Sequence, residues 1–145
     1  MENRDNSEII LYIMVRTDLA SMTPGRVAAQ VSHATSSFHE HVSHHISNYQ
    51  DGLVERWRSE NGVFGKTVVL QVYNDNDISK MANAMAKEFD PVGIVTDQSY
   101  VIRDGQVNIT VPMVTCGFFL TSKQICDRVA CSVFGVALET YKGEQ

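Results

Sequence analysis

The sequence is poor in proline, cysteine and long apolar runs. Its 145 residues include only three prolines and nine glycines, which excludes collagen-like repeats and argues against low-complexity disorder. The longest apolar run, Ile9 to Val15, is far shorter than the roughly 20 residues of a membrane-spanning helix. The first residues also lack a basic stretch followed by an apolar one. We therefore expect a soluble, cytoplasmic protein without a membrane partner.

Disulfide pairing and a net positive charge are also not indicated. Cys116, Cys126 and Cys131 are odd in number, lie in periodic apolar segments and show no CxxC spacing. We expect buried thiols in a reducing compartment. The 12 Lys and Arg residues are outnumbered by 17 Asp and Glu residues, which gives a net charge of −5. This balance argues against a protein that mainly coats nucleic acid, although it leaves room for a local basic patch.

What is present indicates a single α/β domain. The length and the 43% hydrophobic content are typical of one domain spanning 1–145, and we expect its core at about 9–134. Apolar periodicity predicts strands at 9–16, 66–73, 92–96 and 114–120, with helices at about 24–46, 53–60, 75–89 and 122–134. These elements predict a four-stranded mixed sheet with helices on both faces. An extra β-hairpin is expected near 100–110, turning at an Asp-Gly pair. The expected helix N-caps are Thr23, a residue of the polar segment 74–77 and Thr121.

Polar residues gather where the first strand ends and the first helix begins. Arg16 and Asp18 follow the strand, and Arg26, Gln30 and His33 come at spacings that place them on one helix face. Ligands in α/β sheets bind at the carboxyl ends of strands, and the first turn of a helix attracts anions. These residues are therefore candidates for a binding or catalytic site. The alternative is structural: a solvated Arg26, a loop-capping Gln30 and a His33 imidazole satisfied in the core.

A second cluster consists of histidines on the same helix. His41 and His45 have the i, i+4 spacing of a two-imidazole metal chelate. Glu40 is the only neighbouring carboxylate, and Ser43 stands where the HExxH metalloprotease pattern requires its second histidine. We interpret the cluster, which also contains His39 and His44, as a solvated, pH-sensitive face and expect no metal site.

The segments VRTDL (15–19) and GRVAAQVSHA (25–34) together carry a recognisable signature. They resemble the N-terminal motif of type 2 peptidyl-tRNA hydrolases. The similarity continues in the family's order through Trp57, KTVVLQV and GFFLTSKQICDRV, and covers about residues 11–133. It implies a small α/β domain, commonly a homodimer, which hydrolyses the ester between a peptide and the terminal ribose of tRNA. No metal or organic cofactor is implied.

The resemblance also implies candidate catalytic residues. The family associates activity with a lysine that opens the first helix, the histidine of the SHA triplet, an aspartate that ends the third strand and a threonine shortly after it. Arg26 takes the lysine's position and His33 the histidine's. The aspartate corresponds to Asp97, at the end of the strand 92–96, or to Asp104, in the later turn. On the second alignment Val107 replaces the threonine.

These residues suit ester hydrolysis. His33 and one of the two aspartates are general-base candidates, and Arg26 is an electrostatic clamp for developing negative charge. The residues expected to bind substrate are Arg16, Asp18, Gln30, Arg103 and Asn108.

The exchange of lysine for arginine supports a second hypothesis. A guanidinium stays charged and favours phosphate, whereas an ammonium group can give up a proton. The alternative is therefore a catalytically inactive protein on the same scaffold, which binds a nucleotide, a tRNA end or a partner protein.

Overall fold

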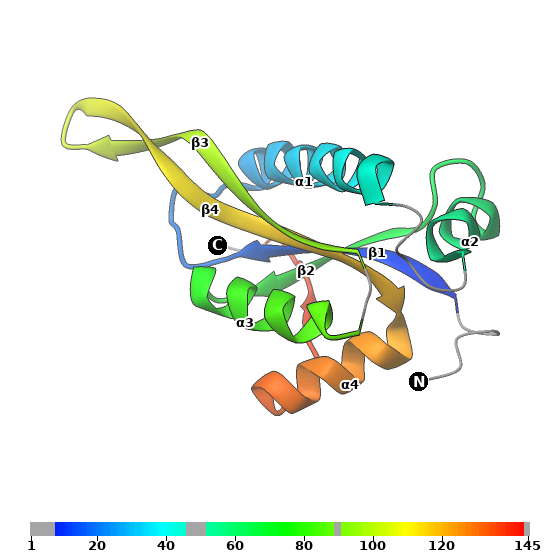
Figure 1. Ribbon diagram of the computed structural model, residues 1–145. Coiled ribbons are helices and arrows are strands. Elements are labelled where there is room, and N and C mark those ends of the chain that lie inside the picture. Colours follow the sequence, from blue (N-terminus) through cyan, green and yellow to red (C-terminus); the bar gives the residue numbers. More distant parts are fainter. Residues whose placement is uncertain (1–7, 46–51, 89–90, 144–145) are drawn as a thin grey trace.

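The computed structural model describes residues 8–45, 52–88 and 91–143. The elements are β1 (Ile9–Arg16), α1 (Pro24–His45), α2 (Leu53–Glu60), β2 (Thr67–Val72), α3 (Asp75–Ala86), β3 (Val92–Asp104), β4 (Val107–Ser122), α4 (Lys123–Phe134) and β5 (Glu139–Thr140). They build one α/β domain around a mixed sheet with the strand order β3-β4-β1-β2-β5 (Figure 1).

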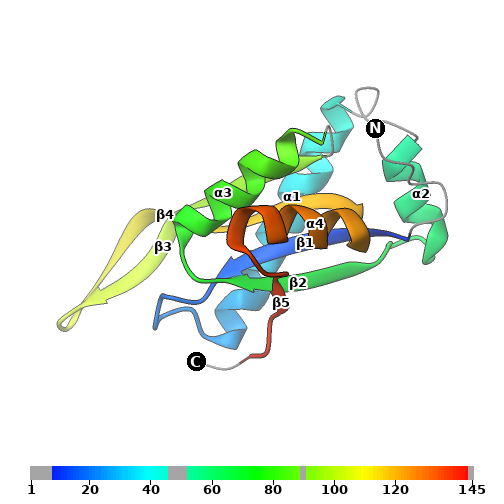
Figure 2. The same cartoon turned by 90° about the horizontal axis from the view of Figure 1, so that it is seen from below.

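Strand β1 is the centre of the sheet. It pairs in parallel with β2 and antiparallel with β4, and all eight of its residues are buried. Leu11 and Ile13 face a core shared with α1 and α2, whereas Ile10 and Tyr12 face a second core shared with α3 and α4. Figure 2 shows β1 between these helices. A strand covered on both faces needs apolar residues at every position, so the predicted central strand is confirmed.

The sheet has five strands, and the prediction of four is wrong. The additional strand, β5, has only two residues and pairs with the outer side of β2 at Leu70 and Gln71. Two residues are too few to leave an alternating pattern in the sequence.

The hairpin expected near 100–110 is not a separate unit. Strands β3 and β4 continue through it as one long antiparallel pair, which turns at Gly105, where φ is +63°. Its outer end extends beyond the body of the domain as an arm (Figure 1). The turn was predictable because Asp-Gly favours tight hairpins, whereas the continuity of the strands depends on their register.

Several local predictions are also settled by the structure. In the segment 74–77, which was expected to cap α3, Asn74 is the cap: its side-chain oxygen accepts a 3.0 Å hydrogen bond from the Asp77 backbone N–H. Helix α3 ends at Ala86, and Phe89, the last residue of the predicted helix, lies outside the described residues.

The cysteines only partly follow the expectation of buried thiols. Cys116 and Cys126 are buried as expected, but Cys131 is exposed. None of the helices in the described ranges is long and apolar enough to span a membrane.

The cap of α4 differs from the prediction. Ser122, not Thr121, accepts a hydrogen bond from the Ile125 backbone N–H at 3.3 Å. Thr121 is instead a fully buried residue of β4. Its hydroxyl has no hydrogen-bond partner among the described residues.

We expect Thr121→Val to stabilise the protein by about 1 kcal/mol, because it removes a buried hydroxyl that lacks a partner and keeps a similar shape. Urea unfolding followed by circular dichroism measures this free energy. A loss of stability in Thr121→Val would show that the hydroxyl is satisfied in solution.

Candidate functional site

Helix α1 presents a polar face to strand β3. Arg26, Gln30 and His33 are spaced at i, i+4 and i+7, so they follow one another along the same side of the helix. Together with Ala29 and with Asp97, Ser99, Tyr100 and Val101 of β3 they line a pocket of about 180 Å³. Three of the residues predicted from the first helix are thus brought together with one of the two candidate aspartates.

A break in strand pairing places Asp97 in this pocket. The register of β3 against β4 shifts between Asp97 and Tyr100, which is a bulge of the kind that re-aims side chains beside functional sites. Asp97 Oδ1 accepts a 2.9 Å hydrogen bond from the Ser99 backbone N–H, so the carboxylate also closes the local turn.

A chain of side chains holds the other oxygen of Asp97. Gln30 Nε2 donates to Asp97 Oδ2 at 2.8 Å, and Thr115 Oγ1 of β4 donates to Gln30 Oε1 at 2.6 Å. Gln30 is only 3% exposed. The hydrogen bonds from Gln30 and from the Ser99 backbone lower the pKa of Asp97, and the nearby His33 adds a smaller effect in the same direction. Asp97 is therefore ionised at neutral pH.

His33 lies at the open side of the pocket. Its Nε2 is 4.0 Å from Asp97 Oδ2, and its side chain is 54% exposed against 18% for Asp97. The two groups are close enough to interact electrostatically but are not directly hydrogen bonded. This spacing leaves the imidazole accessible to a molecule entering from solvent.

Arg26 joins the start of α1 to the edge of the sheet. Its Nη1 donates to the Val101 backbone oxygen at 2.7 Å, and its guanidinium lies 5.5 Å from the centre of the Tyr100 ring. The Tyr100 hydroxyl in turn shares a 2.7 Å hydrogen bond with Ser21. No carboxylate in the described part of the chain forms an ion pair with Arg26. Arg26 therefore brings to the pocket a positive charge that none of the described carboxylates neutralises in an ion pair.

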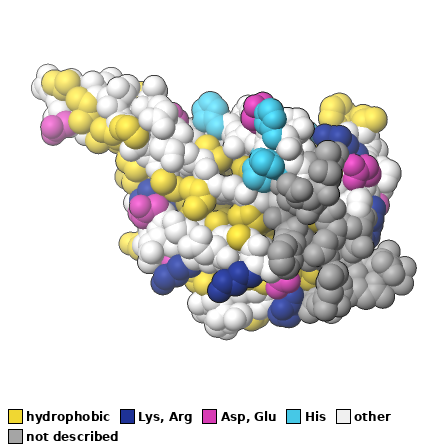
Figure 3. Space-filling model, viewed as in Figure 1, with side chains coloured by type: hydrophobic (Ala, Val, Ile, Leu, Met, Phe, Trp, Pro, Cys, Tyr) yellow, Lys and Arg dark blue, Asp and Glu magenta, His cyan; other side chains and the backbone are white. Residues whose placement is uncertain are grey.

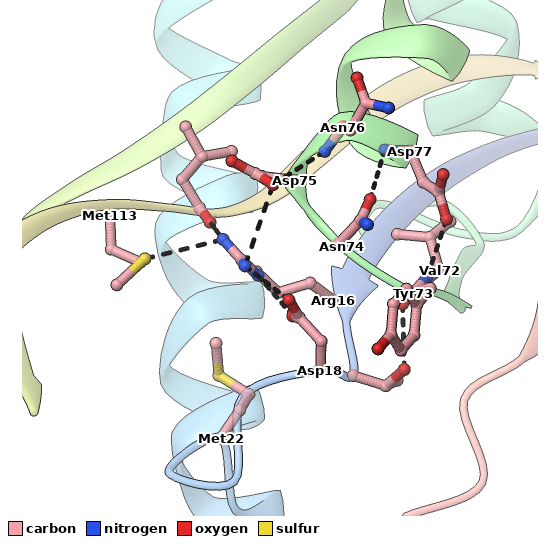
Figure 4. A network of polar contacts seen from close by, with 12 residues as sticks. Arg16, Asp18, Met22, Val72, Tyr73, Asn74, Asp75, Asn76, Asp77 and Met113 are labelled. Carbon is pink, nitrogen blue, oxygen red and sulfur yellow. Dashed lines mark hydrogen bonds and ion pairs between the residues drawn. The ribbon is translucent and has the colours of Figure 1, made fainter.

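Arg16 and Asp18 belong to a neighbouring network (Figure 4). Arg16 Nε and Nη2 each donate to an oxygen of Asp18 at 2.7 Å, and Nη1 donates to the Val114 backbone oxygen at 2.9 Å. The hydrogen bonds from Arg16 lower the pKa of Asp18. Both residues line a second cavity of about 280 Å³ beside Met22 and Tyr141.

The remaining predicted site residues lie on the arm. Arg103 pairs with Asn108, and Asp104 with Val107, at the outer end of the β3–β4 hairpin. Seven positions separate Asp97 from Asp104, which corresponds to roughly 20 Å along a strand. All three polar residues are exposed and none lines the pocket around His33. The structure therefore places Asp97, and not Asp104, beside His33.

The histidine cluster lies farther along α1, and none of its members lines this pocket. Figure 3 shows histidine side chains on the face of the molecule seen there. The His41 and His45 rings are 5.0 Å apart, and His44 contacts Glu40 at 3.1 Å. Burial, with a smaller effect of His45, lowers the pKa of His41. Among the described residues, no group of three or more His, Cys, Asp or Glu side chains is arranged to hold a metal ion.

Sequence reasoning missed the residues that support the pocket from the sheet. Thr115 interrupts an apolar strand, and a lone hydroxyl in a buried segment must find a partner inside the protein. The lone threonine in this strand could therefore have indicated a buried hydrogen bond. Ser99 and Tyr100 reach the site only because of the bulge, which no residue pattern in the sequence indicated.

The fold and the pocket define a small α/β domain with a histidine, a carboxylate and a cation gathered at the edge of its sheet. The family model described as peptidyl-tRNA hydrolase PTH2 matches residues 9–130. The chain belongs to this family, the type 2 peptidyl-tRNA hydrolases. The comparison with individual curated proteins found no match. Family membership supports a function like that of a peptidyl-tRNA hydrolase.

Proposed function

We propose that this protein hydrolyses the ester bond between a peptide and the terminal ribose of tRNA in the pocket around His33 and Asp97. The observation that carries the proposal is the placement of an accessible imidazole 4.0 Å from an ionised, firmly held carboxylate, within a domain of the peptidyl-tRNA hydrolase family.

His33 is the better general base of the two. A carboxylate with a lowered pKa is a weak base, whereas an imidazole can accept a proton near neutral pH. In the proposed reaction His33 takes a proton from water as the water oxygen attacks the ester carbonyl. The carbon–oxygen bond to the ribose then breaks, and the ribose oxygen takes up the proton. The negative charge of Asp97 stabilises the imidazolium form of His33 between these steps.

Arg26 serves as the anion-binding group of this site. Its bond to Val101 and its position over Tyr100 fix the guanidinium at the pocket, and a fixed charge stabilises negative charge without reorganising during the reaction. Guanidinium also recognises phosphate. We assign Arg26 to the ester oxyanion or to the terminal phosphate of tRNA, and not to proton transfer.

A specific observation favours the second candidate function, binding without turnover. His33 and Asp97 are not hydrogen bonded to each other, and Arg26 stands where the family has a lysine. A protein with this pocket and no hydrolytic activity would hold the tRNA end through Arg26.

The test is hydrolysis of a labelled peptidyl-tRNA by the full chain under single-turnover conditions. We expect release of the peptide, and a roughly tenfold weaker half-saturation between 50 and 200 mM salt, because binding to a few phosphates weakens steeply with salt. Salt-sensitive binding without release would establish the binding function instead. If the protein neither binds nor hydrolyses peptidyl-tRNA, both candidate functions are contradicted.

The homodimer expected from the family resemblance stays a prediction, which sedimentation equilibrium tests.

A further inference from the structure

Thr115 does not line the pocket around His33, but its hydroxyl is connected to Asp97 through Gln30. It is fully buried on β4, and Gln30, to which it donates, is 3% exposed. The Gln30 amide then donates to Asp97, whose side chain is 18% exposed. A continuous hydrogen-bonded chain therefore runs from the core to the carboxylate.

The direction of this chain is fixed by chemistry. An ionised carboxylate only accepts hydrogen bonds, so Gln30 has to turn its NH₂ group toward Asp97. Its carbonyl oxygen then points to Thr115, which can satisfy it only by donating its single hydroxyl proton. The 2.6 Å distance between these oxygens fits such a bond. If the amide turned over, its oxygen would face the carboxylate and the two would repel each other.

We propose that Thr115 is a positioning residue for the hydrolytic site: its hydroxyl anchors the Gln30 amide in the orientation that Asp97 requires, and thereby holds the Asp97 carboxylate in place. This inference rests on the proposed function for its consequence in catalysis. Gln30 then supports the site through both ends of its amide, because its oxygen accepts from Thr115 and its NH₂ group donates to Asp97.

Among the groups around Asp97, Gln30 contributes most to the lowered pKa of this carboxyl group. His33 and Arg26 approach from α1, and Cys116 lies behind on β4. Burial raises the pKa of the Cys116 thiol to about 11, so this group is neutral at pH 7. The Gln30 hydrogen bond is the largest cause of the lowered pKa of Asp97. Loss of the Thr115 hydroxyl should therefore be visible as a rise of that pKa.

The experiment compares Thr115→Val with Thr115→Ser and with Thr121→Val. Thr121 is a matched control, because it is also a fully buried threonine of β4 but its hydroxyl bonds to no described residue. Carbon-13 NMR of the Asp97 carboxyl measures its pKa in each folded variant, and peptidyl-tRNA hydrolysis gives kcat and KM. Gln30→Met, alone and combined with Thr115→Val, tests whether Thr115 acts through Gln30.

We expect Thr115→Val to raise the pKa of Asp97 and to lower kcat roughly tenfold with little change in KM, because a small displacement of a reacting group is costly. Thr115→Ser should restore both values, and Thr121→Val should alter neither. In the Gln30→Met background, Thr115→Val should have no further effect. An unchanged Asp97 pKa in Thr115→Val and Gln30→Met, or an additive effect in the double variant, would overturn the proposal. The NMR result decides this even if the wild type shows no turnover, an outcome that would contradict only the proposed function.

Discussion

Replacing Asp97 by asparagine should lower kcat/KM for peptidyl-tRNA roughly 100- to 1,000-fold, since it removes the charge that stabilises the imidazolium of His33. The asparagine keeps the size of the side chain, and its one oxygen can still accept the hydrogen bond from the Ser99 backbone. Its NH₂ group then replaces the oxygen that faces Gln30, whose amide can turn over to accept from it. The fold should therefore remain intact, as thermal unfolding would confirm. Single-turnover hydrolysis measures the loss.

Asp104→Asn is the matched control for this experiment. Asp104 is exposed at the outer end of the arm and does not line the pocket, so we expect activity within about twofold of wild type, as for an exposed residue remote from the reacting groups. His33→Ala should be as deficient as Asp97→Asn. Equal losses in the two aspartate variants, or a loss only in Asp104→Asn, would contradict the assignment of Asp97.

The elements of the fold were predictable where one periodic pattern decided them. The continuous apolar run of β1 required two covered faces, and the helical spacing of apolar residues predicted helices at the positions of α1 and α3. The two-residue β5 and the joining of two short strands into β3 were not predictable, because both depend on pairing with β2 and β4. Pairing between strands is a long-range property that local propensity does not contain.

The candidate site was predictable to the same extent. Arg26, Gln30 and His33 share a helix face, which their spacing alone predicts. Which aspartate lies beside His33 depends on the register of β3 against β4 and on the bulge after Asp97, which local sequence patterns do not contain. Thr115 could be suspected as a buried hydroxyl, but its partner on α1 could not be inferred from an apolar strand.

The ion pair between Arg16 and Asp18 is expected to make a large contribution to the stability of the fold. Arg16 is 7% exposed, and Asp18 supplies both oxygens of its two-point ion pair. We expect Asp18→Asn to lower the free energy of unfolding by about 2–3 kcal/mol at pH 7, because it leaves a buried guanidinium without its carboxylate. Denaturant unfolding measures the difference. Asp75→Asn is the control: Asp75 lies 4.0 Å from Arg16 Nη2 and is 58% exposed, so its loss should cost less than about 1 kcal/mol.

The same pair predicts how this difference depends on pH. Hydrogen bonding to Arg16 puts the pKa of Asp18 in the folded protein below that of an unfolded aspartate, which is about 4. The stabilisation is therefore complete above that value and is lost as the pH falls through the lower, folded pKa. Wild type should lose its advantage over Asp18→Asn below about pH 4. A cost of Asp18→Asn no larger than that of Asp75→Asn, or a cost that persists unchanged in acid, would show that the charge of Asp18 does not stabilise Arg16. In that case the buried Arg16 would owe its stability to Val114 and to packing.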